Sequence, residues 1–208
     1  MNYNSQYQQD KYLNENLFFN KKNGFFIDIG GSEPINQNNT YFFEQNGWNG
    51  IFIEPRLKEH EKIKKYRNCY IENIAIYDKS GTYDFLECDG YIKGLSGLLC
   101  EQKPQHLNRI FNELLTYGKS IEINKIQTLS MIELINKYNI NYVDYLSLDT
   151  EGAEFAILKT IDFNKIKIKA ISVENNYGEN LIHDLLIKNN FEKIISLGCD
   201  EIYINKTI

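Results

Sequence analysis

The amino-acid sequence predicts an α/β sandwich built on a mostly parallel sheet. Short apolar runs alternate with helical patterns along the chain, which is typical of parallel sheets with helices on their faces. The last two strand-like runs, 191–198 and 201–206, are separated by only two residues, which indicates an antiparallel hairpin. The length of 208 residues suits one domain, because two domains would each have a small core.

The first half of the chain alternates between strand and helix. The predicted strands are 25–30, 51–54 and 69–77, with a short antiparallel strand at 81–87. The predicted helices are 38–47 and 56–66. Gly47 closes the first helix, and Pro55 stops the second strand.

The second half repeats this alternation after a less regular middle. Residues 90–99 read as a Gly-punctuated loop, and Ser130 with Glu133 forms a capping box that starts a helix ending near Tyr138. The other predicted helices are 104–117, 152–160 and 178–190. The other predicted strands are 121–127, 143–149 and 169–175.

Composition excludes several classes of protein. With 28 acidic and 23 basic residues the net charge is −5, and a pI near 5.3 argues against a general nucleic-acid binder. No apolar run approaches the roughly 20 residues of a membrane span, and the N-terminus lacks a secretory pattern, so no membrane partner is expected. Four cysteines without a CxxC pair indicate reduced thiols and a cytoplasmic location. The sequence does not indicate an oligomeric state.

Two strand ends predict a cofactor site. Asp28, Gly30 and Gly31 follow the first strand, where glycine lets the backbone approach a ligand. Glu54 ends the second strand, where a carboxylate can accept hydrogen bonds from ribose hydroxyls. Together they favour an adenosine-containing cofactor, whereas the missing third glycine disfavours a dinucleotide. A glycine turn without a ligand and a solvated glutamate are the alternatives.

Acidic residues at two later strand ends predict the reacting site. Asp149 should face the same cleft, and Glu151 follows it at a helix start, where the helix dipole alone also explains an acidic residue. Asp149, Glu174 and Asn175 could bind a divalent cation such as Mg²⁺ or substrate hydroxyls, and an Asn-rich turn is the alternative. His183, and His106 with it, could act as a general base, although a lone helical histidine is more often structural.

Four motifs in series resemble the FkbM family of S-adenosylmethionine-dependent methyltransferases. The resemblance extends from about residue 5 to the C-terminus. The motifs are SQYQQD (5–10), FFIDIG (25–30), GWNGIFIEP (47–55) and LDTEGAE (148–154). The family implies a three-layer sandwich with a seven-stranded, mostly parallel, Rossmann-like methyltransferase sheet and an antiparallel C-terminal hairpin. Many members of the family methylate hydroxyl groups.

The resemblance also implies roles for individual residues. The turn from Asp28 to Gly31 would hold the methionine part of S-adenosylmethionine, and Glu54 would bind its ribose. Ala75 and Ile76 would lie near the adenine, Gln9 would fold back over the cofactor, and Asp149 would lie beside the methyl group. Asp149, Glu174 and Asn175 are similar in position to the metal triad of catechol O-methyltransferases. Pro34 departs from the family pattern and stiffens the glycine turn.

We therefore expect one methyltransferase domain over 1–208, with an N-terminal cap at 1–23 and an acceptor-site insertion at 90–120. The expected reaction is O-methylation of a hydroxyl on a sugar, glycan or small metabolite. The candidate catalytic residues are Asp149, Glu151 and His183. The alternatives are N-methylation of protein or nucleic acid, a non-catalytic binding module of the same fold, and a nicotinamide dehydrogenase.

Overall fold

A seven-stranded mixed sheet forms the centre of the molecule in the computed structural model, which describes residues 2–117 and 120–208. Five strands pair in parallel, in the order β3 (Tyr70–Glu72), β2 (Asn49–Ile53), β1 (Phe25–Ile29), β8 (Tyr142–Leu148) and β9 (Lys167–Glu174). The sheet continues with β11 (Asp200–Asn205), which is antiparallel to β9 and to the edge strand β10 (Phe191–Leu197). The predicted α/β class is confirmed.

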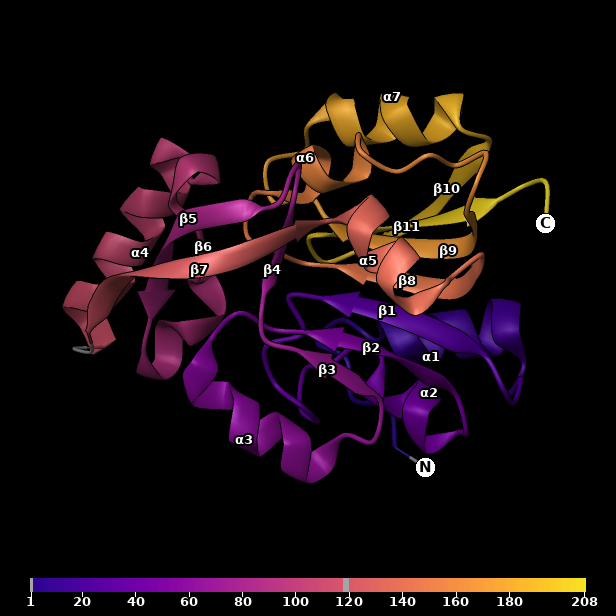
Figure 1. The fold of residues 1–208 in the computed structure, drawn as a ribbon, viewed down its shortest axis with the longest axis horizontal. Helices are drawn as coiled ribbons and strands as arrows, with labels where there is room; N and C mark the ends of the chain where they lie inside the picture. Colours follow the sequence, from indigo (N-terminus) through magenta and orange to yellow (C-terminus); the bar gives the residue numbers. More distant parts are fainter. Residues whose placement is uncertain (1, 118–119) are drawn as a thin grey trace.

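A second, four-stranded sheet lies to one side of the first (Figure 1). Its strands, in spatial order, are β4 (Ala75–Tyr77), β7 (Ile121–Ser130), β5 (Gly81–Cys88) and β6 (Gly97–Leu98). The single strand expected at 69–77 is therefore wrong, because the chain leaves one sheet after Glu72 and enters the other at Ala75. Between them, the Asn73 side chain donates hydrogen bonds to the carbonyls of Glu54 and Pro55, at 2.9 and 3.1 Å.

The helices expected from residue 38 onward are present in the predicted order, most with different bounds, whereas the helix Gln9–Leu13 was not expected. They are α1 (Gln9–Leu13), α2 (Tyr41–Gln45), α3 (Leu57–Tyr66), α4 (Pro104–Tyr117), α5 (Met131–Tyr138), α6 (Glu154–Leu158) and α7 (Asn180–Lys188). A π-helical turn, η1 (Asn14–Phe18), extends α1, and two 3₁₀ turns, η2 (Gly90–Leu95) and η3 (Leu99–Glu101), replace most of the loop expected at 90–99. The predicted capping box of Ser130 and Glu133 is confirmed at the start of α5. Residues 118 and 119 of the expected acceptor segment lie outside the described residues.

Alternate residues of the strands separate two buried layers. Phe26 of β1 packs with Phe43 and Trp48 in a cluster that includes α1, η1 and α2. Its neighbour Ile27 faces the opposite cluster, which includes buried residues of α5, α6 and α7. Helices thus cover both faces of the large sheet. Among the described residues, no helix is long and apolar enough to cross a membrane.

Candidate active site

A largely apolar cavity lies at the carboxyl ends of β1 and β2, between the two sheets. Its empty volume is about 490 Å³, which includes space open to solvent. The apolar part of its wall is formed by Ile29, Ile53, Ile74, Ala75, Ile76, Phe85, Leu98 and Ala153. Ala75 and Ile76, which the family resemblance assigns to the adenine, therefore line this apolar cavity. Glu54, Arg56 and Asp149 are its charged members beside Lys93.

Glu54 reaches this cavity with its carboxylate already held in place. Its Oε2 accepts a hydrogen bond from the Ser32 backbone N–H at 3.0 Å, and its Oε1 accepts from the Arg56 Nε at 2.9 Å. Both side chains of this ion pair are only 4% exposed. Arg56 also donates to the Ser32 hydroxyl at 2.9 Å and to the Lys93 carbonyl at 3.2 Å. Arg56 thus connects the strand end that bears Glu54 to the glycine turn and to η2.

The backbone of the fold itself requires glycine at position 30, which the sequence analysis did not predict. The φ of Gly30 is +80°, and a Cβ at this position would lie 1.7 Å from the Asp149 carbonyl oxygen. From the sequence, we expected Gly30 to let the backbone approach a ligand. In the structure, Gly30 lets the backbone approach the Asp149 carbonyl just after β8. Gly30 lines the cavity, whereas Gly31 packs against Phe52, where a Cβ would lie 2.4 Å from the ring.

Asp28 supports the turn from behind instead of lining the cavity. It belongs to β1 and is 2% exposed. Its Oδ2 accepts hydrogen bonds from the Thr40 hydroxyl at 2.6 Å and from the Asn38 amide at 2.9 Å. Burial raises the pKa of Asp28, against the opposing effect of the Arg67 charge. Asn38 also donates to the Gly31 carbonyl at 3.2 Å, so Asp28 orients the turn through Asn38.

A second, polar cavity adjoins the first. The two share Gly30, Ser32, Gly94 and Asp149, and the second has an empty volume of about 1,110 Å³. Five carboxylates line it: Glu33, Glu113, Asp149, Glu151 and Glu174. Arg109 of α4 is its one guanidinium among the described residues. Asp149 therefore lies where an apolar chamber opens into an acidic one.

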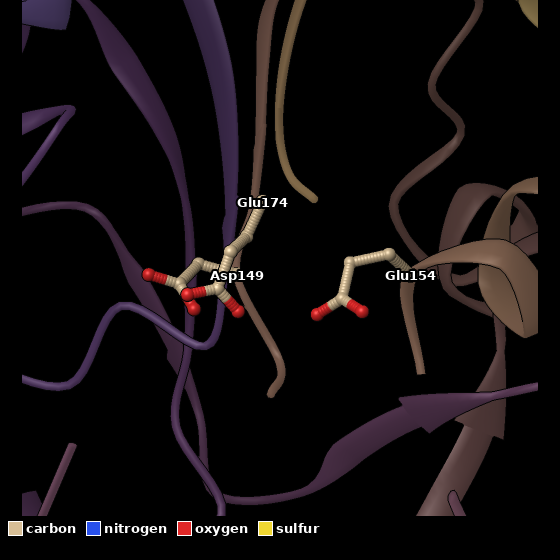
Figure 2. Close-up of side chains that lie close together, drawn as sticks. All are labelled: Asp149, Glu154 and Glu174. Atoms are coloured by element: carbon tan, nitrogen blue, oxygen red, sulfur yellow. The ribbon is translucent and has the colours of Figure 1, made fainter. Parts of the chain in front are cut away.

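The carboxylate of Asp149 lies close to two others. Asp149, Glu154 and Glu174 each place an oxygen within 4.8 Å of the others. Figure 2 shows Asp149 and Glu174 beside one another and Glu154 opposite them. Burial, followed by the nearby charge of Glu174, raises the pKa of Asp149 well above its ordinary value. Burial and Glu151 likewise raise the pKa of Glu174.

The expected metal ligands are not assembled as a set. Asn175 uses its amide on Glu179, accepting from the backbone N–H at 2.9 Å and donating to the carbonyl at 3.1 Å. Glu154 takes the third place in the cluster, but its carboxylate accepts from the backbone N–H groups of Thr150 and Gly152 and from the Thr150 hydroxyl. Two carboxylates, Asp149 and Glu174, remain for a cation, so the donor set does not fit a protein-held Mg²⁺ well.

His183 lies away from both cavities, whereas His106 lies beside Glu151. His183 on α7 lies beside the Tyr203 hydroxyl, 3.3 Å from its Nδ1, on the β11 side of the sheet and not at either cavity. His106 on α4 is 2% exposed, and its Nε2 donates to the Leu95 carbonyl at 3.0 Å. Its Nδ1 lies 3.4 Å from Glu151. Candidate base His183 is thus displaced from the site, because α7 packs its apolar side on the sheet through Ile182 and Leu186.

The N-terminal segment reaches the site through residues other than Gln9. Gln9 is 2% exposed and donates to the Asp200 carboxylate at 2.6 Å, while its carbonyl oxygen accepts from the Tyr7 backbone N–H at 2.9 Å. Gln6 and Tyr7 line the acidic cavity. Gln9 therefore holds the N-terminal segment in place, and Gln6 and Tyr7 are the residues of this segment that reach the site.

Sequence reasoning missed Arg56, Tyr7 and Arg109 as residues of the site. Arg56 had a local signal, since an arginine two residues after the predicted ribose carboxylate can pair with it. Tyr7 lies within the SQYQQD motif, but only Gln9 of that motif was given a place at the cofactor. Arg109 had no signal, because an arginine in a mid-chain helix acquires its place only through tertiary folding.

The sequence matches the family model described as "Methyltransferase FkbM domain" over residues 28–196. Among solved structures the chain is similar to methyltransferase FkbM from Methylobacillus flagellatus KT, with 9% identity and a TM-score of 0.48. That alignment covers 88% of this chain and 43% of the other, so this chain spans less than half the length of that protein. The search of curated proteins returned no match.

Proposed function

Because the chain belongs to the FkbM methyltransferase domain family, we propose that it is an S-adenosylmethionine-dependent methyltransferase acting on a hydroxyl of a sugar, glycan or small metabolite. The observation that carries the proposal is the position of Glu54. It follows the strand beside the glycine turn and lines the apolar cavity. The strand order, with antiparallel β11 next to β9, also agrees with the methyltransferase sandwich that the family implies.

The lining of the apolar cavity supports a specific arrangement of the cofactor. Ala75 and Ile76 would contact the adenine, and Glu54 would accept hydrogen bonds from the ribose hydroxyls. Arg56 holds the Glu54 carboxylate in one orientation through its Nε. Gly30 and Asp149, which line both cavities, would lie at the methionine end.

S-adenosylmethionine supplies a methyl group on a positively charged sulfur, which makes the group ready for displacement. The chain's main task is therefore to align the acceptor oxygen, and alignment alone can supply effective molarities of about 10⁵ M or more. Asp149 would accept the proton that the acceptor hydroxyl loses as its oxygen displaces the neutral thioether from the methyl carbon. A carboxylate with a raised pKa is suited to this role, since its proton affinity lies nearer that of the acceptor.

Glu151 and Glu174 would bind the acceptor from the acidic cavity, which both residues line. Part of the proposed acceptor region 90–120 also contributes, with Tyr91, Ile92 and Leu95 from η2 and Arg109 from α4. The proposed reaction uses no metal ion. Glu154 is bonded to the backbone, and the two other carboxylates of the cluster, Asp149 and Glu174, are too few to hold Mg²⁺.

Transfer of a labelled methyl group from S-adenosylmethionine to fractionated glycans and small metabolites tests this function. We expect label in a hydroxyl-bearing fraction, with loss of label in Asp149→Asn. Label on a protein or nucleic-acid nitrogen would favour the N-methyltransferase alternative. Cofactor binding without transfer to any fraction would favour a binding module.

A further inference from the structure

The acidic cavity has an uneven distribution of charge. Two of its five carboxylates are already paired with cations: Glu113 with Arg109, at 3.0 Å, and Glu33 with Lys62 and Lys93. The three inner carboxylates, Asp149, Glu151 and Glu174, form no ion pair with a lysine or arginine within residues 2–117 and 120–208. The innermost part of the cavity thus holds three carboxylates without a lysine or arginine countercharge, and the nearby ionisable nitrogen is Nδ1 of His106, 3.4 Å from Glu151.

Glu174 is an almost unpartnered carboxylate aimed into this space. It is 7% exposed and lines the acidic cavity. One oxygen faces the Cys199 thiol, a weak donor, at 3.8 Å, and the nearby Asn176 amide acts to lower the pKa of Glu174. No lysine or arginine of the described residues pairs with this largely buried carboxylate, so it is suited to a charged donor brought by a ligand.

We propose that the acceptor carries an ammonium group, as an amino sugar does, and that Glu174 and Glu151 bind this ammonium while Asp149 faces the neighbouring hydroxyl. The inference rests on the proposed function, since it names the class of acceptor for the same site. Asp149 and Glu174 lie side by side, with oxygens within 4.8 Å. An amine and a hydroxyl on adjacent carbons of one sugar ring can therefore reach both.

An ammonium fits these residues better than a metal ion does. Glu154, the third carboxylate of the cluster, accepts from the Thr150 N–H at 2.7 Å and from Gly152, so it is occupied by the backbone. An ammonium needs two or three acceptors, whereas Mg²⁺ requires a near-octahedral oxygen set. Tyr7 and Tyr91 also line this cavity, and tyrosine rings can contact cations or sugar faces.

Four sugars of nearly the same shape test the proposal. Binding of glucosamine, N-acetylglucosamine, glucose and glucuronate is measured by calorimetry at pH 7, with S-adenosylhomocysteine bound first. We expect glucosamine to bind at least tenfold more tightly than glucose or N-acetylglucosamine, because charge-assisted hydrogen bonds change affinity by more than that factor. Glucuronate should bind most weakly, because its carboxylate would meet the acidic wall.

Variants locate the preference at Glu174. Glu174→Gln should reduce the ratio of glucosamine to glucose affinity to within about threefold of unity, while Glu192→Gln, an exposed carboxylate on β10, should leave it unchanged. The thermal midpoint of each variant reports whether it folds. Equal binding of glucosamine and glucose, no binding of glucosamine, or a preference that survives in folded Glu174→Gln would overturn the proposal.

Two further outcomes separate this proposal from others. Binding of MgCl₂ alone at micromolar concentration, lost in Glu174→Gln, would overturn it in favour of a metal site. Failure of S-adenosylhomocysteine to bind would contradict the proposed function itself. Bound S-adenosylhomocysteine without an ammonium preference would contradict only the acceptor class.

Discussion

Asp149 combines a position between two cavities with a carboxyl group whose pKa is raised by burial and by Glu174. Asp149→Asn preserves the shape of the side chain but removes its ability to accept a proton. We expect kcat to fall by about 10²–10⁴, the usual contribution of a general base, while the Kd for S-adenosylhomocysteine stays within about twofold. Asp162→Asn, outside both cavities, is the control. Wild-type turnover in the Asp149 variant would assign the chemistry to another residue.

Gly30 and Gly47 provide a matched pair for testing the glycine turn. Both have positive φ, +80° and +92°, but a Cβ at Gly30 meets the Asp149 carbonyl at 1.7 Å, whereas a Cβ at Gly47 meets nothing within 4 Å. Gly47→Ala should therefore lower the free energy of unfolding by about 1–2 kcal/mol through backbone strain alone. Gly30→Ala should lower it by about 2–4 kcal/mol, since overpacking is added. Urea unfolding measures both, and equal losses would refute the close approach.

Glu174 gives a prediction on pH. Burial and Glu151 raise the pKa of its carboxyl in the folded chain, whereas the unfolded chain keeps a value of about 4.3. Between these two values the folded state holds more protons, so the free energy of unfolding falls as pH rises through this interval. Glu174→Gln removes the effect.

We therefore expect Glu174→Gln to unfold at a thermal midpoint about 2–4 °C higher than the wild type at pH 8, which corresponds to about 1 kcal/mol for a chain of this size. The difference should shrink toward pH 4, where both proteins are neutral at this position. Scanning calorimetry at both pH values checks it. A midpoint at pH 8 that is lower than that of the wild type would show that the ionised carboxylate stabilises the fold.

The sequence predicted residues whose role depends on strand ends, and it was less successful where roles depend on side-chain direction. Glu54 and Asp149 line the cavities because the ends of parallel strands meet at one edge. Asp28 ends up behind the turn because successive residues of a strand face opposite sides, and Ile29 takes the cavity side. His183 and Gln9 are set by packing between elements far apart in sequence, which no local pattern encodes.

At the scale of elements, the order of helices and strands from residue 25 onward was largely predictable, but α1 and the change of sheet between β3 and β4 were not. CYIENIAIY has continuous strand character, and only the hydrogen bonds of Asn73 to Glu54 and Pro55 mark the point of departure. Residues 90–99 were expected to be a loop because of their glycines. They form η2 and β6, since β5 offers a free edge to which Gly97 and Leu98 pair.

Arg56 connects η2 to the end of β2, because it donates hydrogen bonds to Glu54 and to the Lys93 carbonyl. A substitution at Arg56 tests whether this connection holds η2 in place. Arg56→Lys keeps the charge but cannot reproduce the bonds of the guanidinium to Glu54, Ser32 and the Lys93 carbonyl. We expect amide hydrogen exchange in residues 90–95 to become at least tenfold faster in Arg56→Lys, measured by mass spectrometry. Arg109→Lys, whose exposed guanidinium pairs with Glu113, is the control. Unchanged protection of 90–95 in Arg56→Lys would show that η2 is held by other contacts.

At the scale of the whole molecule, two sheets enclose an apolar cavity that opens into an acidic one, and the proposed reaction takes place where they meet. The net charge of −5 is thus not spread evenly, because part of it gathers around the acidic cavity. Composition argues against general nucleic-acid binding, but it could not reveal this local concentration of charge. The second sheet, which closes the apolar cavity with Phe85 and Leu98, was likewise beyond local pattern.

The measurement that tests the central claim most directly is thermal unfolding with and without S-adenosylhomocysteine. At 100 times its Kd, the ligand should add about 2.7 kcal/mol to the free energy of unfolding, or a rise of about 5–10 °C in the thermal midpoint for a chain of this size. Glu54→Gln should need at least tenfold more ligand for the same rise, whereas Glu72→Gln, at the end of β3, should behave as the wild type. No rise at millimolar S-adenosylhomocysteine, or a rise with NAD instead, would contradict the assignment of this cavity.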